Sequence, residues 1–229
     1  MKRVLLLQHE PFEGPGTLGD ALSGCDVRLV RTFAGDAVPT SLADDGLVVL
    51  GGGMGVYEAE RYPHLKDELR LLRAASAEER PVLGICLGSQ LLAAAVGGAV
   101  AKAPRKEIGW YGVDLLPGAR DDALFAAAPV AFPAFHWHGD AFTLPRGAVS
   151  LASSAMTPLQ AFRVGPRAWG IQFHLETDRQ VLDAMLDSGA DDLRDAGADA
   201  AAIRASAADE LPRLRESALR IFGRWAALL

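Results

Sequence analysis

One stretch of the chain reads PVLGICLGSQ, from Pro81 to Gln90. Its first five residues are an apolar run opened by proline, which predicts a buried strand. The segment from Ser89 to Val96 is rich in Ala and Leu and ends at two glycines, which predicts a helix. Between them, Gly-Ile-Cys-Leu-Gly has the spacing of G-x-S-x-G with Cys86 in the serine position. The glycines leave room for a sharp strand-to-helix turn that pushes a nucleophile into solvent.

The setting of Cys86 predicts a reactive thiol. A thiol at a helix N-terminus faces unpaired N–H groups and the positive end of the helix dipole, so we expect a pKa below the usual value of about 8.5. The alternative is a small buried cysteine in a glycine-flanked turn, which is the common state of a free cysteine. Cys25 has no helix behind it and is interpreted as structural.

Similar apolar runs, each bounded by Gly, Asp or Pro, precede this unit at residues 3–8, 26–30 and 46–50, and all three are predicted to be buried strands. A helical period follows Pro63 and ends before Pro81. Strands that alternate with helices predict a mostly parallel α/β sheet.

From about Ile108 onward the pattern becomes richer in strands. We expect strands at residues 110–116, 130–135, 148–153, 159–164 and 168–173. The tail, residues 177–229, is predicted to be helical and to cap the same core, with an apolar stripe formed by Leu211, Leu214, Ala218, Phe222 and Trp225. We find no linker, so the sequence predicts one domain over residues 1–229.

Composition excludes several functions. The chain has 229 residues, with 23 Lys+Arg against 29 Asp+Glu and a net charge of -6, which argues against a nucleic-acid partner. No apolar run approaches the roughly 18–20 residues that cross a bilayer, so no membrane partner is expected. Two cysteines in a chain of this length make no disulfide framework, and a cytoplasmic location is the expectation.

A base for the thiol is predicted near residue 174. Along a strand, side chains alternate between two faces, so Gln172, His174 and Glu176 would share one face. Glu176 would accept from one imidazole nitrogen, and the other nitrogen would take the thiol proton. The alternative is a solvated strand face with three polar residues.

Glycines 51–53 follow the strand at residues 46–50. They lack the Gly-Lys-Ser/Thr ending of a phosphate loop and the last glycine of G-x-G-x-x-G. An oxyanion hole suits them better, with one loop N–H and the N–H of Leu87 stabilising a tetrahedral oxyanion. A plain tight turn is the alternative.

The segment from His136 to Asp140 is a dense polar cluster. Two histidines on one strand face, with His174, Glu176 or Asp140, offer ligands for zinc or iron. A pocket wall with one structural histidine is favoured, and we assign no metal and no cofactor. His64 is expected at the surface and His9 at the pocket rim.

Taken together, the sequences around residues 84–90, 136–140 and 170–176 resemble the class I glutamine amidotransferases, the triad group related to the glutaminase half of GMP synthetase. The resemblance spans residues 3–176. It implies a flavodoxin-like, doubly wound α/β fold with Cys86 as nucleophile, His174 as general base and acid, and Glu176 as the orienting carboxylate.

The same resemblance implies backbone and pocket roles. It matches the N–H groups of Gly53 and Leu87 to the oxyanion hole and Gln90 to a residue that contacts glutamine. Three further residues match the neighbourhood that holds the amino-acid end of the substrate: Trp137, His138 and Asp140.

Two departures from the family pattern bear on function. Leu175 stands where the family has proline between His and Glu, and only a helical tail follows Glu176 where an ATP-using synthetase domain is expected. The sequence therefore predicts hydrolysis of glutamine or a γ-glutamyl compound, with ammonia passed to a separate synthase. The alternatives are a stand-alone γ-glutamyl peptidase, a non-catalytic or redox-sensing module, and a metal-dependent hydrolase.

Overall fold

A computed structural model describes all residues from 1 to 229. Nine strands form one sheet in the order β2-β1-β3-β4-β9-β8-β7-β5-β6. The first five in this order are parallel, and the rest are antiparallel. The strands are β1 (Arg3–Gln8), β2 (Asp26–Arg31), β3 (Gly46–Val49), β4 (Val82–Ile85), β5 (Val100–Leu115), β6 (Ala131–Phe142), β7 (Val149–Ser154), β8 (Ala161–Val164) and β9 (Ala168–Ile171).

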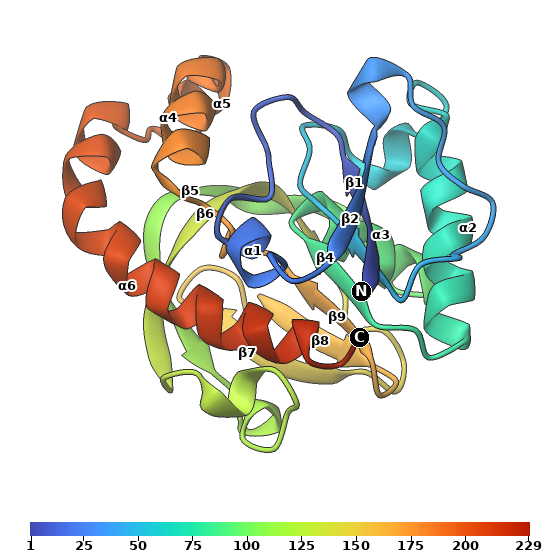
Figure 1. Cartoon of the computed structure of the whole chain (residues 1–229). Helices are drawn as coiled ribbons and strands as arrows, with labels where there is room; N and C mark the ends of the chain where they lie inside the picture. The colour runs from blue at the N-terminus through green and yellow to red at the C-terminus, as the bar shows by residue number, and fades with distance from the viewer.

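The parallel half has the flavodoxin-like order that the family resemblance implied. The helices are α1 (Gly16–Ala21), α2 (His64–Ala77), α3 (Leu87–Ala95), α4 (Arg179–Ser188), α5 (Ala190–Ala196) and α6 (Ala200–Ala226). Figure 1 shows α2 and α3 on one side of the parallel strands and α1 with the long α6 on the other. The α/β fold class predicted from the sequence is confirmed.

Each face of the sheet supports its own apolar core. Alternate residues of β1, such as Leu5 and Leu7, pack with α2 and α3, whereas Val4 and Leu6 pack with α1 and α6. Strands covered on both faces read as unbroken apolar runs, which is why β1, β3 and β4 stand out in the sequence. None of the helices combines the length and the apolar character that crossing a bilayer requires.

Three sequence predictions about the strands need correction. The segment 26–31 is a strand, but it lies at the edge of the sheet and most of its residues are exposed. The strands predicted at 110–116 and 130–135 are parts of the much longer β5 and β6, which pair with each other as an antiparallel ribbon. The strand predicted to reach residue 173 ends at Ile171.

The tail is helical, as predicted, and its apolar stripe packs on the core. Leu214, Ala218, Phe222 and Trp225 are fully buried, and Leu211 packs against them in part. Short turns separate the tail into α4, α5 and α6 (Figure 1). The first two of these helices lie beyond the carboxyl ends of the parallel strands, where open α/β sheets bind ligands.

The turn between β4 and α3 depends on two close approaches of the backbone. A Cβ at Gly84 would overlap the carbonyl of Gly88, and a Cβ at Gly88 would overlap the carbonyl oxygen of Val49. Both positions therefore exclude a side chain for steric reasons, as the sequence pattern predicted. Helix α3 can approach β3 this closely because its second residue, Gly88, has no side chain.

Substituting Gly88→Ala is expected to lower the free energy of unfolding by roughly 1–3 kcal/mol because backbone must move to admit the methyl group. Helix propensity alone would favour alanine by about 1 kcal/mol, so the sign tests the contact. Urea unfolding measures the change. Gly24→Ala, where a Cβ meets nothing within 4 Å, is the control and should change stability by less than about 0.5 kcal/mol. Equal changes in the free energy of unfolding for Gly88→Ala and Gly24→Ala would contradict this steric explanation.

Candidate active site

Cys86 lies at the turn between β4 and α3 with a backbone conformation that L-residues rarely adopt. Its φ is 50° and its ψ is -109°, and Glu79 is the one other non-glycine residue with positive φ. The N–H of Cys86 donates to the carbonyl of Ile171 at 2.8 Å, which fixes the turn against the end of β9. Strain of this kind persists only where the surrounding structure enforces it, and it concentrates at functional sites.

The side chain of Cys86 is 6% exposed and lines a cavity. Its Sγ donates to the backbone carbonyl of Trp137 at 3.6 Å, and the amide of Gln172 lies 4.0 Å from it. The thiol is thus held between the end of β4 and the middle of β6. The interpretation of Cys86 as a cysteine sealed in the core does not fit this position, because the cavity opens directly onto the sulfur.

His174 and Glu176 form a buried hydrogen-bonded pair beside this thiol. Nδ1–H of His174 donates to Oε1 of Glu176 at 2.6 Å, which leaves Nε2 for a second partner. The backbone N–H of His174 donates to the carbonyl of Phe135 at 2.8 Å and sets the imidazole against β6. The side chains of His174 and Glu176 are 1% and 2% exposed, so the alternative of a solvated strand face is wrong.

The local backbone differs from the predicted strand. β9 ends at Ile171, and His174 makes one isolated bridge to Phe135. The i, i+2 spacing nevertheless directs both side chains to the same side. Residues on the opposite side of this segment, Phe173 and Leu175, are fully buried, so packing on both sides holds the segment in place.

Charges shift the pKa values of the two reactive groups. Burial alone would lower the pKa of His174, but the carboxylate of Glu176 and the thiolate form of Cys86 raise it well above 6.5. Burial raises the pKa of the Cys86 thiol, and the imidazolium of His174 opposes that effect. The net direction for Cys86 is opposite to the lowering that we expected from its helix N-terminus, because desolvation outweighs the stabilising charge.

The glycine loop after β3 is held by a buried ion pair. Nδ1 of His9 donates to the carbonyl of Gly51 at 2.8 Å, and Nε2 donates to Glu68 at 2.9 Å. Burial lowers the pKa of His9, but the charge and the hydrogen bond of Glu68 outweigh burial, so the net direction is upward. Acceptors at both ring nitrogens favour the doubly protonated imidazole. His9 is therefore buried beneath the loop and not at the pocket rim, and His64 is half-buried because it also bonds Glu68 at 2.9 Å.

The loop leaves two amides free near the thiol. The N–H groups of Gly53 and Leu87 have no hydrogen-bond partner in the chain, whereas that of Gly88 donates to the carbonyl of Leu50. Gly53 lines the same cavity as Cys86, and Leu87 is the next residue after the thiol. Unpaired backbone donors near a nucleophile are what an oxyanion hole requires.

The structure distributes the other four predicted residues around the cavity. Gln90 is buried with its amide 3.5 Å from Gln172. Trp137 offers its backbone carbonyl to Cys86, and Asp140 lies at the rim, 3.4 Å from the hydroxyl of Tyr57. All of them border one cavity, as does His138, whose Nε2 is 3.0 Å from the buried carboxylate of Glu107.

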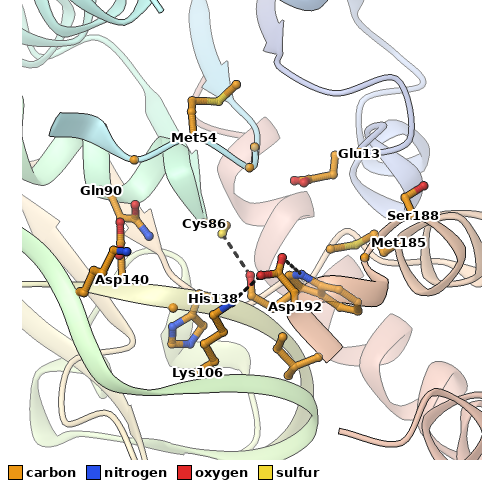
Figure 2. Close-up of a pocket in the computed structure, with 18 of the residues that line it drawn as sticks. Glu13, Met54, Cys86, Gln90, Lys106, His138, Asp140, Met185, Ser188 and Asp192 are labelled. Carbon is orange, nitrogen blue, oxygen red and sulfur yellow. Dashed lines mark hydrogen bonds and ion pairs between the residues drawn. The ribbon is translucent and has the colours of Figure 1, made fainter. Parts of the chain in front are cut away.

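The cavity encloses about 340 Å³ and receives residues that sequence reasoning missed. Lys106 comes from β5, and Met185, Ser188 and Asp192 come from α4 and α5 (Figure 2). Asp192 bonds Lys106 at 2.6 Å and the indole N–H of Trp137 at 3.2 Å, which fastens the helical tail to the pocket wall. No local sequence pattern indicates that these residues line the cavity, because the packing of α5 on β5 places them there.

Glu13 is a further cavity residue that the sequence did not predict. It follows β1 on the chain and borders the cavity. A usable signal did exist: residues just after a parallel strand gather at the edge of the sheet where the other strands end.

Two clusters contain enough ligand atoms for a metal: His9, His64 and Glu68 form the first, and Glu107, His136 and His138 form the second. In the second, Glu107 already accepts from Ser154 at 2.5 Å and from Gln160 at 2.7 Å, in addition to His138. Its oxygens are therefore engaged with the protein. The metal site considered from the sequence combined His136 and His138 with His174, Glu176 or Asp140. The two histidines do lie together in the second cluster, but their acidic neighbour is Glu107, and none of the three other candidates belongs to either cluster.

Comparisons with known proteins agree with this fold. Residues 21–188 match the class-I glutamine amidotransferase family. A crystal structure of a glutamine amidotransferase from Thermotoga maritima is 32% identical, has a TM-score of 0.88 and covers 98% of both chains. One from Methylobacillus flagellatus is 30% identical with a TM-score of 0.89, covering 100% of this chain and 96% of that one.

Sequence relatives agree as well. The glutamine amidotransferase-like protein YfeJ of Salmonella typhimurium is 33% identical over 85% of this chain and 84% of its own length. A glutamine-hydrolysing GMP synthase of Thermomicrobium roseum is 36% identical over 63% of this chain, which spans 26% of that protein. The fold is an α/β sheet with a sharp strand-to-helix turn at Cys86, and the chain belongs to the class-I glutamine amidotransferase family.

Two replacements of Cys86, both of which remove the thiol, measure the backbone strain at this turn. Cys86→Gly is expected to be more stable than Cys86→Ala by about 1 kcal/mol, because glycine adopts this backbone conformation without strain. Chemical denaturation of the two variants measures the difference. A Cys86→Ala protein at least as stable as the glycine variant would show that the turn carries no strain.

The charge of Glu176 is expected to set the protonation of His174. In Glu176→Gln the negative charge beside Nδ1 is lost, so the pKa of His174 should fall. NMR titration of the imidazole, assigned with a His174→Asn variant, measures the shift. Asp183→Asn, which removes a surface carboxylate on α4, is the matched control. An unchanged His174 pKa in Glu176→Gln would refute the coupling.

Proposed function

We propose that this protein hydrolyses the γ-amide of glutamine or of a γ-glutamyl compound through a γ-glutamyl thioester. The observation that carries the proposal is the buried His174–Glu176 pair beside a thiol that faces a cavity from a strained turn. Family membership supports it, because the relatives above include glutamine-hydrolysing enzymes. An orienting carboxylate, a base and a nucleophile together form the arrangement of covalent acyl transfer.

In this mechanism His174 takes the proton of Cys86, and the thiolate attacks the γ-carbonyl carbon. The carbonyl oxygen becomes an oxyanion that accepts hydrogen bonds from the N–H groups of Gly53 and Leu87. His174 then protonates the leaving nitrogen, and the C–N bond breaks. The products of this half are the thioester and ammonia or an amine.

Water completes the reaction. His174 removes a proton from a water molecule, which attacks the thioester carbonyl. The tetrahedral intermediate collapses, glutamate leaves, and the proton returns to the thiol of Cys86. Throughout, Glu176 stabilises the imidazolium and keeps Nε2 directed toward the reacting atoms.

The substrate-facing residues divide the remaining work. Gln90 borders the cavity and is assigned to contact the glutamine substrate. Three further residues on the cavity wall are assigned to the amino-acid end of the substrate: Trp137, His138 and Asp140. The chain spans 26% of the glutamine-hydrolysing GMP synthase of Thermomicrobium roseum. By analogy with such relatives, we propose a synthase as the acceptor of the ammonia.

A stand-alone γ-glutamyl peptidase is the second candidate, and the size of the cavity favours it. At about 340 Å³ the cavity lies within the range of about 300–1,000 Å³ typical of pockets for drug-sized ligands. It therefore has room for a leaving group larger than ammonia, which glutamine hydrolysis does not need.

The thiol is expected to be indispensable. Cys86→Ala should lower the rate of glutamate release at least about 1,000-fold, because nucleophile loss removes the covalent route. The assay uses glutamine and a panel of γ-glutamyl amines and peptides, with intact-mass detection of the γ-glutamyl adduct on the wild type. Cys25→Ala is the matched control and should retain full activity. Glutamate release by Cys86→Ala at the wild-type rate would refute the mechanism.

A further inference from the structure

The carboxyl group of Glu13 has no hydrogen-bond partner in the protein. The residue is 7% exposed, and Oε2 is fully buried and unpaired. Leaving a buried polar group unpaired is costly, so native structures seldom tolerate it without a reason. Glu13 borders the same cavity as Cys86, and its carboxylate points into that space (Figure 2). These features are typical of a carboxyl group that pairs with a bound ligand.

The loop that carries Glu13 is anchored to the reactive residues. It connects β1 to α1, and at its end the N–H of Thr17 donates to the carbonyl of Glu176 at 2.8 Å. Gly16 lies so close to that carbonyl that a Cβ would overlap it, and its φ of 43° also requires glycine. The position of Glu13 is therefore fixed relative to the His174–Glu176 pair.

Glu13 lies on the imidazole side of the cavity. Oε2 of Glu13 and Cε1 of His174 both pack against the Cα of Gly51, where a Cβ would overlap the carboxylate and lie 3.1 Å from the ring. The unpaired amides of Gly53 and Leu87 belong to the side assigned to the carbonyl oxygen. In the proposed mechanism, His174 delivers its proton to the leaving nitrogen, so that nitrogen would lie on the same side of the cavity as Glu13.

The electrostatic surroundings of Glu13 fit a ligand that donates hydrogen bonds. Burial raises its pKa to about 7, the charges of Glu176 and Glu10 add to this, and His174 and His9 oppose it. A bound N–H donor would favour the ionised carboxylate.

On the basis of the proposed function, we propose that Glu13 accepts a hydrogen bond from the leaving nitrogen of the scissile γ-amide. Glutamine presents two N–H groups on that nitrogen and a secondary γ-glutamyl amide presents one, so both substrate classes satisfy the carboxylate. An ester presents none. Glu13 is thus a specificity-determining residue that makes the site select amides over esters with the same γ-glutamyl group.

The test compares glutamine with the γ-methyl ester of glutamate in the wild type, Glu13→Gln and Glu13→Leu. For glutamine, kcat/KM is expected to fall about 10-fold in Glu13→Gln, which keeps a neutral acceptor, and about 100-fold in Glu13→Leu, which keeps none. For the ester, kcat/KM should change by less than about twofold, because no N–H is lost. Glu10→Gln removes a charge from the same loop and should leave the amide-to-ester ratio unchanged.

Thermal unfolding at pH 8 provides a second measurement. The pKa of Glu13 in the folded chain is above the ordinary value of 4.5, so its contribution to stability is lost as pH rises toward and past about 7. At pH 8 the carboxylate is ionised and unpaired, and Glu13→Leu should therefore melt at the same temperature as the wild type or higher. If Glu13 had a purely structural role, its replacement by leucine would lower the melting temperature.

Each outcome is informative. Equal losses for amide and ester would overturn the assignment, because Glu13 would then act on steps that both substrates share. Unchanged glutamine hydrolysis in both Glu13 variants would also overturn it. A wild-type protein that cleaves neither substrate would refute the proposed function itself, and the role of Glu13 would fall with it.

Discussion

The close approach of α3 to β3 and β4 is the constraint on which the rest of the site depends. Gly88 touches the carbonyl of Val49, and Gly84 touches the first turn of the helix, so the chain reverses within a few residues. This reversal forces Cys86 into its positive φ and places Sγ at the floor of the cavity. A wider turn would relax the backbone, but it would also move the thiol away from β6 and His174.

The polar residues around this turn are buried in pairs, and the pairing makes the burial tolerable. The ion pair of His9 and Glu68 holds the glycine loop, and His174 with Glu176 holds the imidazole. Breaking one partner of such a pair leaves an uncompensated charge, which is far more costly than the pair itself. Glu13 differs from the others because it lacks a partner, and this difference makes it informative about substrate binding.

The β-rich half and the tail form the parts of the cavity wall that the parallel strands do not provide. The ribbon of β5 and β6 brings the backbone carbonyl of Trp137 to the thiol. Helices α4 and α5 contribute Met185, Ser188 and Asp192 to the cavity wall (Figures 1 and 2). The tail is therefore a wall of the candidate site as well as a cap on the core.

The sequence by itself determined the α/β class, the turn at Cys86 and the pairing of His174 with Glu176, because these rest on local spacing: apolar runs, flanking glycines and an i, i+2 interval. Tertiary structure alone decided that β9 ends at Ile171, that burial raises the pKa of Cys86, and that Glu13 and Asp192 face the cavity. Such features depend on residues far apart in the chain, and desolvation is a property of the packed interior. Neither long-range contacts nor desolvation produces a periodic pattern in the sequence.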